Sequence, residues 1–223
     1  MALAIFDLDN TLLSDDSDHL WGIFLSEQGI VDADYYEKEN ERFYQEYKDG
    51  KLDILEFLAF SLRPLAENKL SDLLNWRQKF IEEKIMPIIP QASFDLLKKH
   101  IEKGDTLMII TATNKFVTQP IADILGIKHL IATDPELIDN QYTGNVSGEP
   151  SFQHGKVNRL NDWLKDSSET LEGSYFYSDS HNDIPLLEMV THPIAVDPDE
   201  KLTQHATENQ WPIISLRNSG IIT

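Results

Sequence analysis

Two aspartates and a threonine at the end of an apolar run are the residues in this sequence best suited to chemistry. Asp7 and Asp9 follow the apolar residues 2–6, and Thr11 comes two positions later. The run lacks helical spacing, so it predicts a strand buried on both faces. Open α/β sheets bind ligands outside the carboxyl ends of their strands, where both carboxylates would project. An Asx-type turn that merely ends the strand is the alternative.

Three further polar clusters follow other predicted strands. Thr111 lies where a strand gives way to a helix, which makes either an anion site or a plain helix cap. Lys156 lies at a helix start, where cations are unusual, although a lone lysine is more often a surface residue. Asp179 and Asp183 follow an aromatic strand, and a helix cap alone would need only one of them.

These strand ends together supply four carboxylates, a hydroxyl and an amine. Mg²⁺ prefers oxygen ligands and often binds one or two carboxylates together with substrate phosphate, so the convergence predicts a magnesium site. Phosphoryl transfer also needs a nucleophile, an acid/base group and positive charge on the moving oxygens. The pattern therefore favours phosphoryl-transfer chemistry.

The order of these clusters resembles the four motifs of the haloacid dehalogenase-like phosphatases. The first and fourth motifs are specific, whereas the second and third are weak alone. The four segments are residues 6–11, Thr111, Lys156 and residues 178–183. An inserted helical segment after the first motif, and an asparagine in the fourth at Asn182, resemble phosphoserine phosphatase-like members. The surroundings of His19 and residues 148–157 look like a bacterial branch of that group whose substrates are poorly defined.

The resemblance implies roles for the carboxylates. Asp7 would be the nucleophile that forms an aspartyl-phosphate. Asp9 would protonate the leaving alkoxide and then act as base on the hydrolytic water, a division of labour that environment can set. The carboxylates of Asp7 and Asp179 and the backbone carbonyl of Asp9 would bind Mg²⁺, with Asp183 supporting the metal site. An aspartate at position 9 favours phosphatase chemistry over dehalogenation.

The resemblance also implies contacts to phosphate and substrate. Thr111, Ala112 and Lys156 would hold the phosphoryl oxygens. The candidates for substrate binding are Thr11, Asp16, His19, Arg63 and Asn182. Among them, Asp16 falls near a glutamate that receives a substrate ammonium in phosphoserine phosphatases, and Arg63 near an arginine that receives a carboxylate. After Thr111, however, the chain has Ala112 and Thr113 where that group has small glycine-type residues.

The elements that must position these residues alternate between strands and helices outside one segment. Such alternation predicts an α/β fold with a doubly wound parallel sheet. Strands are predicted at 2–6, 106–110, 130–132, 175–177, 193–196 and 213–216, with a hairpin near 142–146. Helices are predicted at 19–28, 35–47, 52–62, 69–85, 94–102, 116–125, 156–165 and 183–190.

Residues 15–86 are predicted to be all helical, and their aromatic residues to pack between helices. We therefore expect two domains: an α/β core of residues 1–14 and 87–223, and a helical cap of residues 15–86.

Composition narrows the class of partner. The chain has 223 residues, a formal net charge of −19 and no cysteine. The charge disfavours nucleic acid and anionic membranes, and the lack of cysteine excludes disulfides and thiolate chemistry. No secretion signal or membrane-length apolar run is evident, so a cytoplasmic location is expected.

The sequence therefore predicts a Mg²⁺-dependent phosphomonoesterase acting on a small phosphorylated metabolite. Phosphoserine is one substrate, and histidinol phosphate or another amine-bearing phosphate is another. A phosphotransferase that uses the same aspartyl-phosphate also fits, because only water access separates the two reactions. The alternative from another class is a catalytically silent regulatory module of the same fold. No residue in the sequence identifies an oligomeric interface.

Overall fold

The computed structural model describes residues 1–217, and within them a parallel six-stranded sheet forms the centre of the molecule. The strand order is β3-β2-β1-β6-β7-β8. The strands are β1 (Leu3–Phe6), β2 (Thr106–Asn114), β3 (His129–Thr133), β6 (Tyr175–Ser178), β7 (His192–Val196) and β8 (Ile213–Ile214). All neighbouring strands run parallel, which confirms the predicted doubly wound sheet.

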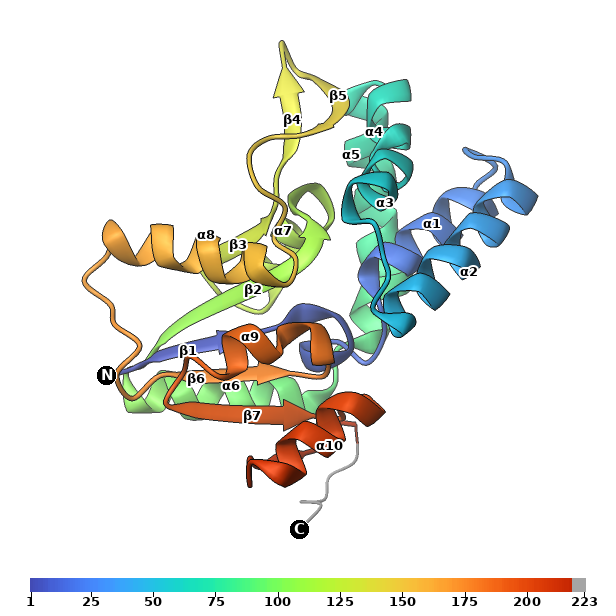
Figure 1. Cartoon of the computed structure of the whole chain (residues 1–223). Coiled ribbons are helices and arrows are strands. Elements are labelled where there is room, and N and C mark those ends of the chain that lie inside the picture. Colours follow the sequence, from blue (N-terminus) through green and yellow to red (C-terminus); the bar gives the residue numbers. More distant parts are fainter. Residues whose placement is uncertain (218–223) are drawn as a thin grey trace.

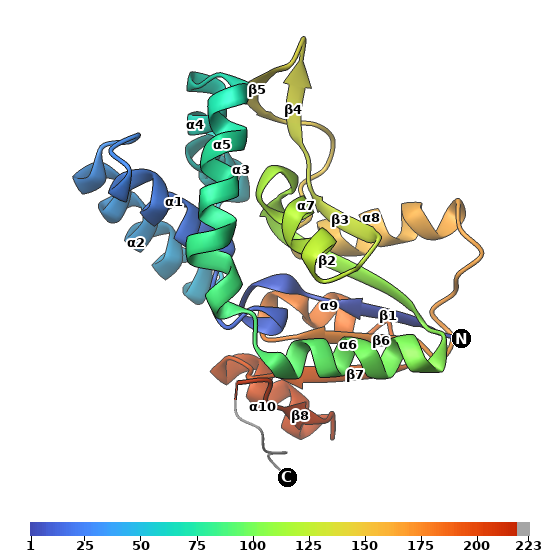
Figure 2. The ribbon, with the colours of Figure 1, turned by 180° about the vertical axis from the view of Figure 1, so that it is seen from behind.

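Helices cover both faces of the sheet. One face packs against α6 (Gln91–Lys103) and α7 (Lys115–Ile124), and the other against α8 (His154–Lys165), α9 (Ile184–Leu187) and α10 (Glu200–Glu208). Figure 1 shows α8 and α9 in front of the sheet, and Figure 2, from behind, shows α6 on the opposite side. In β1, Ala4 and Phe6 join the first core cluster while Leu3 and Ile5 join the second. The apolar start of the chain is thus a strand buried on both faces.

Only helical segments join β1 to β2, apart from their connecting loops. They follow the tight turn η1 (Leu8–Leu12), in which Asn10 has a φ of 55°. The segments that precede α6 are α1 (Ser17–Glu27), α2 (Ala33–Asp49), α3 (Ile54–Ser61), α4 (Arg63–Glu67), α5 (Leu70–Phe80), η2 (Ile81–Ile85) and η3 (Met86–Ile88). Asp16, Asp32 and Asp53 cap the N-termini of α1, α2 and α3 through their side chains. We call residues 15–86 the helical insertion.

A hairpin of β4 (Pro135–Ile138) and β5 (Gln141–Val146) projects from the sheet beside the helical insertion (Figure 1). The Gln141 side-chain amide donates hydrogen bonds to the carbonyls of Ala66 and Asn68, at 3.0 and 3.1 Å. The Tyr142 ring packs edge-on against Phe116 of α7, with centroids 5.5 Å apart. The hairpin therefore joins the helical insertion to the rest of the molecule.

The observed elements differ from the predicted ones in several places, three of which matter for the argument below. Strand β2 extends to Asn114, so Thr111 lies within it rather than beyond its end. Helix α10, capped by Asp199, was not predicted. Tyr36 and Phe43 of α2 are buried between helices as expected, whereas Tyr44 of the same helix is 44% exposed. No helix within residues 1–217 is long and apolar enough to cross a membrane.

Candidate active site

Three charged side chains from different elements meet in the interior at the carboxyl end of the sheet. The Lys156 ammonium donates to Asp7 Oδ1 at 2.7 Å and to Asp183 Oδ2 at 2.8 Å. Asp7 follows β1, Lys156 lies in the first turn of α8, and Asp183 ends the 3₁₀ turn η4 (His181–Asp183). All three are at least 94% buried. Ser178 Oγ also donates to Asp183 Oδ2, at 2.7 Å, so both neighbours of that oxygen are donors.

Gly155 allows Lys156 to reach this position. A Cβ on Gly155 would lie 2.1 Å from the carbonyl oxygen of Pro150, inside any permitted contact. The close backbone approach therefore fixes where α8 begins, and with it the direction of the lysine side chain.

The Asp9 carboxylate is held from two sides. Its Oδ1 accepts the backbone N–H of Ser17 at 2.7 Å. Its Oδ2 accepts the hydroxyl of Thr113 at 2.7 Å, and the Thr111 hydroxyl lies 3.4 Å from the same oxygen. The turn η1, in which Asp9 is extended and Asn10 left-handed, thus directs this carboxylate toward β2 rather than along β1.

Asp179 completes the group of acids that the sequence predicted. The Thr11 hydroxyl donates to Asp179 Oδ1 at 3.1 Å and accepts the Asp179 backbone N–H at 3.1 Å. Thr11 is 98% buried behind Asp179 and does not line the cavity described below. Its observed contacts are therefore with the side chain and backbone of Asp179.

The buried carboxylates outnumber the one cation among them. Burial raises the pKa of Asp7 to about 7; the attraction of Lys156 opposes this rise, and the negative charges of Asp183 and Asp9 add to it. Burial, with Asp7 and Asp183 nearby, holds the pKa of Asp179 well above its ordinary value. Although burial opposes its charge, Asp183 and Asp7 raise the pKa of Lys156. A second cation would therefore stabilise the ionised carboxylates.

The donor set fits Mg²⁺. Two carboxylates, from Asp7 and Asp179, and one backbone carbonyl, from Asp9, are the few protein oxygens that this ion takes when it keeps water and binds phosphate. Within residues 1–217, no three acidic or histidine side chains form a ready-made metal cage. A site that relies on two carboxylates and substrate oxygens agrees with that finding.

A cavity of about 120 Å³ opens above these residues, between the sheet and the helical insertion. Its floor includes Asp7, Asp9, Thr111, Ala112, Lys156, Asp179, Asn182 and Asp183. Its wall from the helical insertion includes Asp16, Asp18, His19, Asn40, Phe43, Tyr44, Tyr47, Leu52, Ile54 and Phe57. The cavity suits a small molecule that places one end on the floor residues and the other on the insertion.

The wall is acidic beside Asp9. Asp16 accepts the backbone N–H groups of Asp18 and His19, both at 2.9 Å, and so caps α1. Burial and the nearby Asp9 raise the pKa of Asp16 to about 7. Burial, followed by Asp16 and Asp9, holds the pKa of Asp18 well above its ordinary value. The His19 ring stacks on Tyr44 with centroids 6.4 Å apart.

The structure does not bring Arg63 to this cavity. Its guanidinium lies over the rings of Tyr35 and Tyr36, 5.1 and 5.6 Å from their centroids, and 3.7 Å from Glu67. Arg63 is absent from the cavity lining. The expectation that it would meet a substrate carboxylate there is not supported by its position, because the aromatic pair holds it on α4.

Several residues at the site were not singled out from the sequence. Thr113, which holds Asp9, could have been found because it lies two positions after Thr111 on one strand. Gln153, which donates to Asn182 Oδ1 at 2.8 Å, lies three residues before Lys156, the first residue of the predicted helix. Tyr47 was assigned to helix packing, and no local signal separates it from the buried aromatic residues of α2.

Comparison with known proteins gives concordant matches. The family model described as haloacid dehalogenase-like hydrolase matches residues 4–188. A protein named histidinol-phosphatase from Neisseria meningitidis is 44% identical over 96% of this chain and 99% of its own. One named phosphoserine phosphatase SerB1 from Mycobacterium tuberculosis is 26% identical, covering 97% of this chain and 71% of its own.

Solved structures extend the comparison to the fold. A Bordetella pertussis protein of unknown function has a TM-score of 0.91 and 42% identity, covering 96% of this chain and 98% of its own. A phosphoserine phosphatase structure with an analogue of the phospho-aspartyl intermediate has a TM-score of 0.70 and 19% identity, covering 97% and 93%. At that identity the second match shows the fold alone.

Proposed function

The chain belongs to the haloacid dehalogenase-like hydrolase family, and from this premise we propose that it hydrolyses a small phosphomonoester through Asp7. One observation carries the proposal. The Asp7 carboxylate lies at the floor of a closed-over cavity, paired with Lys156, with Asp9 held two residues away toward the same cavity. The proposed nucleophile, the proposed acid/base group and a fixed positive charge thus lie near one another, which supports phosphoryl transfer.

The proposed reaction has two steps. An Asp7 carboxylate oxygen attacks phosphorus, the bond from phosphorus to the ester oxygen breaks, and Asp9 gives its proton to the departing alkoxide. Water then attacks the aspartyl-phosphate while Asp9 takes a proton from it, and inorganic phosphate leaves with Asp7 restored. The hydrogen bonds from Ser17 and Thr113 would orient Asp9 for both transfers.

Lys156, Thr111 and the backbone at Ala112 would bind the phosphoryl oxygens. Lys156 would offset the charge that Asp7 and the phosphoryl group bring together, and its pairing with Asp183 would hold it in place when Asp7 reacts. Asp7, Asp179 and the Asp9 carbonyl would hold Mg²⁺, which supplies positive charge to the phosphoryl group. Thr11 would orient Asp179.

We further propose that the helical insertion is a cap domain over a core of residues 1–14 and 87–223. Its helices α1, α2 and α3 supply the cavity wall opposite the catalytic carboxylates. A wall of this kind would exclude bulk water from the reacting phosphoryl group and would contact the non-phosphate end of the substrate.

The acidic wall favours a substrate whose far end is cationic. Asp16 and Asp18 would repel the carboxylate of phosphoserine, and Arg63, a cation that would offset this repulsion, lies outside the cavity. Histidinol phosphate carries an amine and an imidazole but no carboxylate, so it suits this wall better. Similarity to the Neisseria protein named histidinol-phosphatase supports the same choice. We therefore propose histidinol phosphate, or a related amine-bearing phosphate, as the substrate.

The test is phosphate release from histidinol phosphate, phosphoserine, sugar phosphates, nucleotides and p-nitrophenyl phosphate, with Mg²⁺ or with EDTA. We expect metal-dependent turnover that is fastest on the amine-bearing ester. Asp7→Asn should reduce kcat roughly 10⁴-fold or more, as removal of a catalytic nucleophile commonly does. Turnover that survives Asp7→Asn would refute the assignment of the nucleophile, and fastest turnover on phosphoserine would refute the assignment of the substrate.

A further inference from the structure

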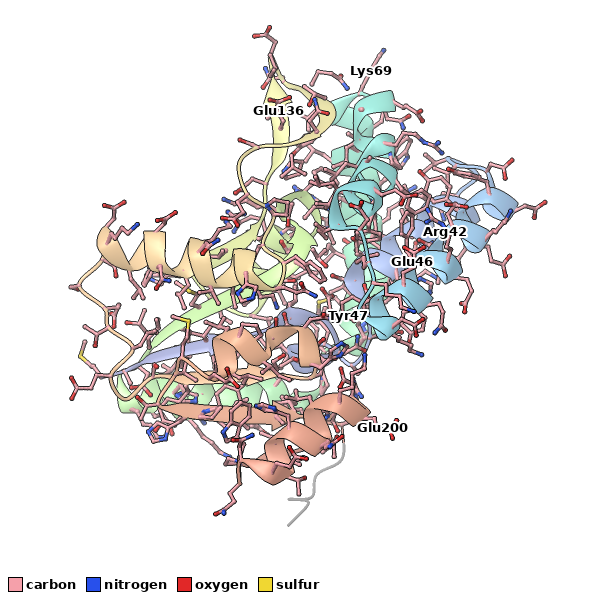
Figure 3. The ribbon with its side chains drawn as sticks, viewed as in Figure 1. Arg42, Glu46, Tyr47, Lys69, Glu136 and Glu200 are labelled. Atoms are coloured by element: carbon pink, nitrogen blue, oxygen red, sulfur yellow. The ribbon has the colours of Figure 1, made fainter. Side chains whose placement is uncertain are left out.

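One hydrogen bond joins the helical insertion to the loop of residues 179–183, which carries Asp179 and Asp183. The Tyr47 hydroxyl, at the end of α2, donates to Ser180 Oγ at 2.7 Å across 133 positions of sequence. Figure 3 shows Tyr47 at the end of α2 that meets the rest of the molecule, with Arg42 and Glu46 farther along the helix. The Tyr47 ring also lines the cavity.

Ser180 occupies a central position in its loop. It lies between Asp179 and Asp183, and its hydroxyl oxygen accepts the Asn182 backbone N–H at 3.2 Å and the Asn182 side-chain amide at 3.3 Å. Ser180 is 96% buried and caps the turn η4 that presents Asp183 to Lys156. A displacement of the Ser180 hydroxyl would therefore also displace the two acidic residues of the loop, Asp179 and Asp183.

A second contact fixes the same end of α2. The Lys201 ammonium, at the start of α10, donates to the Lys48 carbonyl at 3.1 Å and lies 3.4 Å from His181 Nε2. His181 itself is held by Asp199, whose carboxylate accepts its backbone N–H at 2.9 Å and contacts its ring Nδ1 at 2.7 Å. The C-terminal end of α2 therefore contacts both the 179–183 loop, through Tyr47, and α10, through the Lys48 carbonyl.

We propose that Tyr47 is a positioning residue that makes docking of the helical insertion and ordering of the 179–183 loop a single event. When α2 is docked on the loop, the Tyr47 hydroxyl holds Ser180, and the loop presents Asp179 and Asp183 to the cavity. When α2 moves away, the loop loses that hydrogen bond. The inference rests on the proposed function, because it assigns an effect on catalysis to a residue that touches none of the reacting atoms. The ring alone would close the cavity, so the hydroxyl is the part with the proposed role.

Tyr47→Phe isolates the hydroxyl, because the ring and its packing are kept. Loss of one neutral hydrogen bond should raise KM by roughly three- to tenfold. The kcat value should stay within about twofold, because apparent affinity scales with the fraction of molecules in the docked state. The matched control is Tyr35→Phe, the same change on the same helix at a half-exposed position outside the cavity. It should leave KM and kcat unchanged.

Hydrogen exchange gives a readout that does not depend on activity. Tyr47→Phe should speed amide exchange at residues 44–50 and 179–183 and nowhere else, and Tyr35→Phe should not. In a double-mutant cycle, Tyr47→Phe should cause no further rise of KM in a Ser180→Ala background, since its partner is already gone. Ser180→Ala also removes the cap of η4, so the double variant could fail to fold. In that case hydrogen exchange of Tyr47→Phe alone tests the proposed link between Tyr47 and the loop.

The inference fails if Tyr47→Phe matches wild type in KM and in exchange, or if its effect adds in full to that of Ser180→Ala. It also fails if kcat and the unfolding midpoint fall together while exchange rises throughout the chain, which is the signature of a general loss of structure. If wild type hydrolyses no ester, the proposed function fails, and local exchange alone decides whether the tie between Tyr47 and the loop exists.

Discussion

At the scale of single residues, Asp18 is the member of the cavity wall whose charge is least satisfied. Within residues 1–217, the one hydrogen bond recorded for its carboxylate is a long one, 3.4 Å, from the Asn114 side-chain amide. Asn114 is fixed in that orientation because its oxygen accepts the Val117 N–H and caps α7. Burial, Asp16 and Asp9 raise the pKa of Asp18, and a cationic substrate group would reverse that effect.

Asp18→Asn should therefore change substrate preference rather than the chemical step. We expect kcat/KM for an amine-bearing phosphoester to fall roughly ten- to hundredfold, the worth of a hydrogen bond to a charged group. Hydrolysis of p-nitrophenyl phosphate, which carries no cation, should be unchanged. Steady-state kinetics on both esters measure the ratio. Asp15→Asn, an exposed neighbour outside the cavity, is the matched control; equal losses on both esters would contradict the assignment.

The residues around the reacting centre could be predicted from sequence to the extent that they are local in the chain. Asp7 and Asp9, like Asp179 and Asp183, stand close together after a strand, and the structure brings both pairs to one cavity. Arg63 could not be located because its direction depends on the two tyrosines beneath it. Tyr47 could not be recognised because its partner, Ser180, lies in a distant loop.

At the scale of secondary-structure elements, strong local signals predicted position well. Gly104 ends α6 in the left-handed conformation, two residues beyond the predicted end of the helix at residue 102. The end of β2 was misjudged because Thr111 and Thr113 are polar. Both nevertheless lie in the strand, where the Thr111 hydroxyl accepts the Thr113 backbone N–H and the Thr113 hydroxyl donates to Asp9. Helix α10 was missed because only Leu202 and Ala206 of its residues are buried, which gives a weak periodic signal.

The start of α8 provides a test of how one element positions catalysis. Gly155→Ala would place Cβ against the Pro150 carbonyl, a backbone atom that no rotamer change can move away. We expect a loss of about 1–3 kcal/mol of unfolding free energy from overpacking. The accompanying shift of Lys156 should reduce kcat roughly 10²-fold, as a misplacement of 1 Å can.

The comparison for that variant is Asn161→Ala, at an exposed position of the same helix. It should alter neither the urea midpoint nor kcat. If Gly155→Ala lost stability but kept full activity, the placement of Lys156 would not depend on the close approach of α8 to Pro150.

At the scale of the whole molecule, elements far apart in sequence are joined by buried polar side chains as well as by the apolar core. His100 of α6 contacts Asp105 through Nδ1 and the Tyr177 hydroxyl of β6 through Nε2, each at 2.9 Å. Asp105 Oδ1 also accepts the backbone N–H of Ala2 at 2.8 Å. This chain of hydrogen bonds holds α6, β6 and the segment before β1 together at the end of the sheet opposite the cavity.

The protonation of this network should make the whole fold sensitive to acid. Burial lowers the pKa of His100, so the folded protein binds that proton less readily than the unfolded chain. Although burial opposes it, hydrogen bonds from His100 and the Ala2 N–H hold the pKa of Asp105 below its ordinary value. Both shifts contribute stability that is complete above the unfolded pKa and is lost as the pH falls through the folded one. For His100 that loss begins near pH 6.5, and for Asp105 near pH 4.

His100→Gln should therefore destabilise the protein more at pH 7 than at pH 5. The gap between wild type and variant should narrow by at most about 1.4 kcal/mol per pH unit, the limit for one titrating group. Urea unfolding at fixed pH values between 5 and 7.5 measures it. The difference in unfolding free energy between wild type and His100→Gln is the relevant quantity. Asp7 and Asp16, each with a pKa of about 7, take up protons in the same range and thereby stabilise both proteins on acidification. A gap that widens toward pH 5 would mean that His100 is charged in the folded protein and that its contact with Asp105 is an ion pair, and a constant gap would mean that the pKa of His100 is the same in the folded and unfolded states.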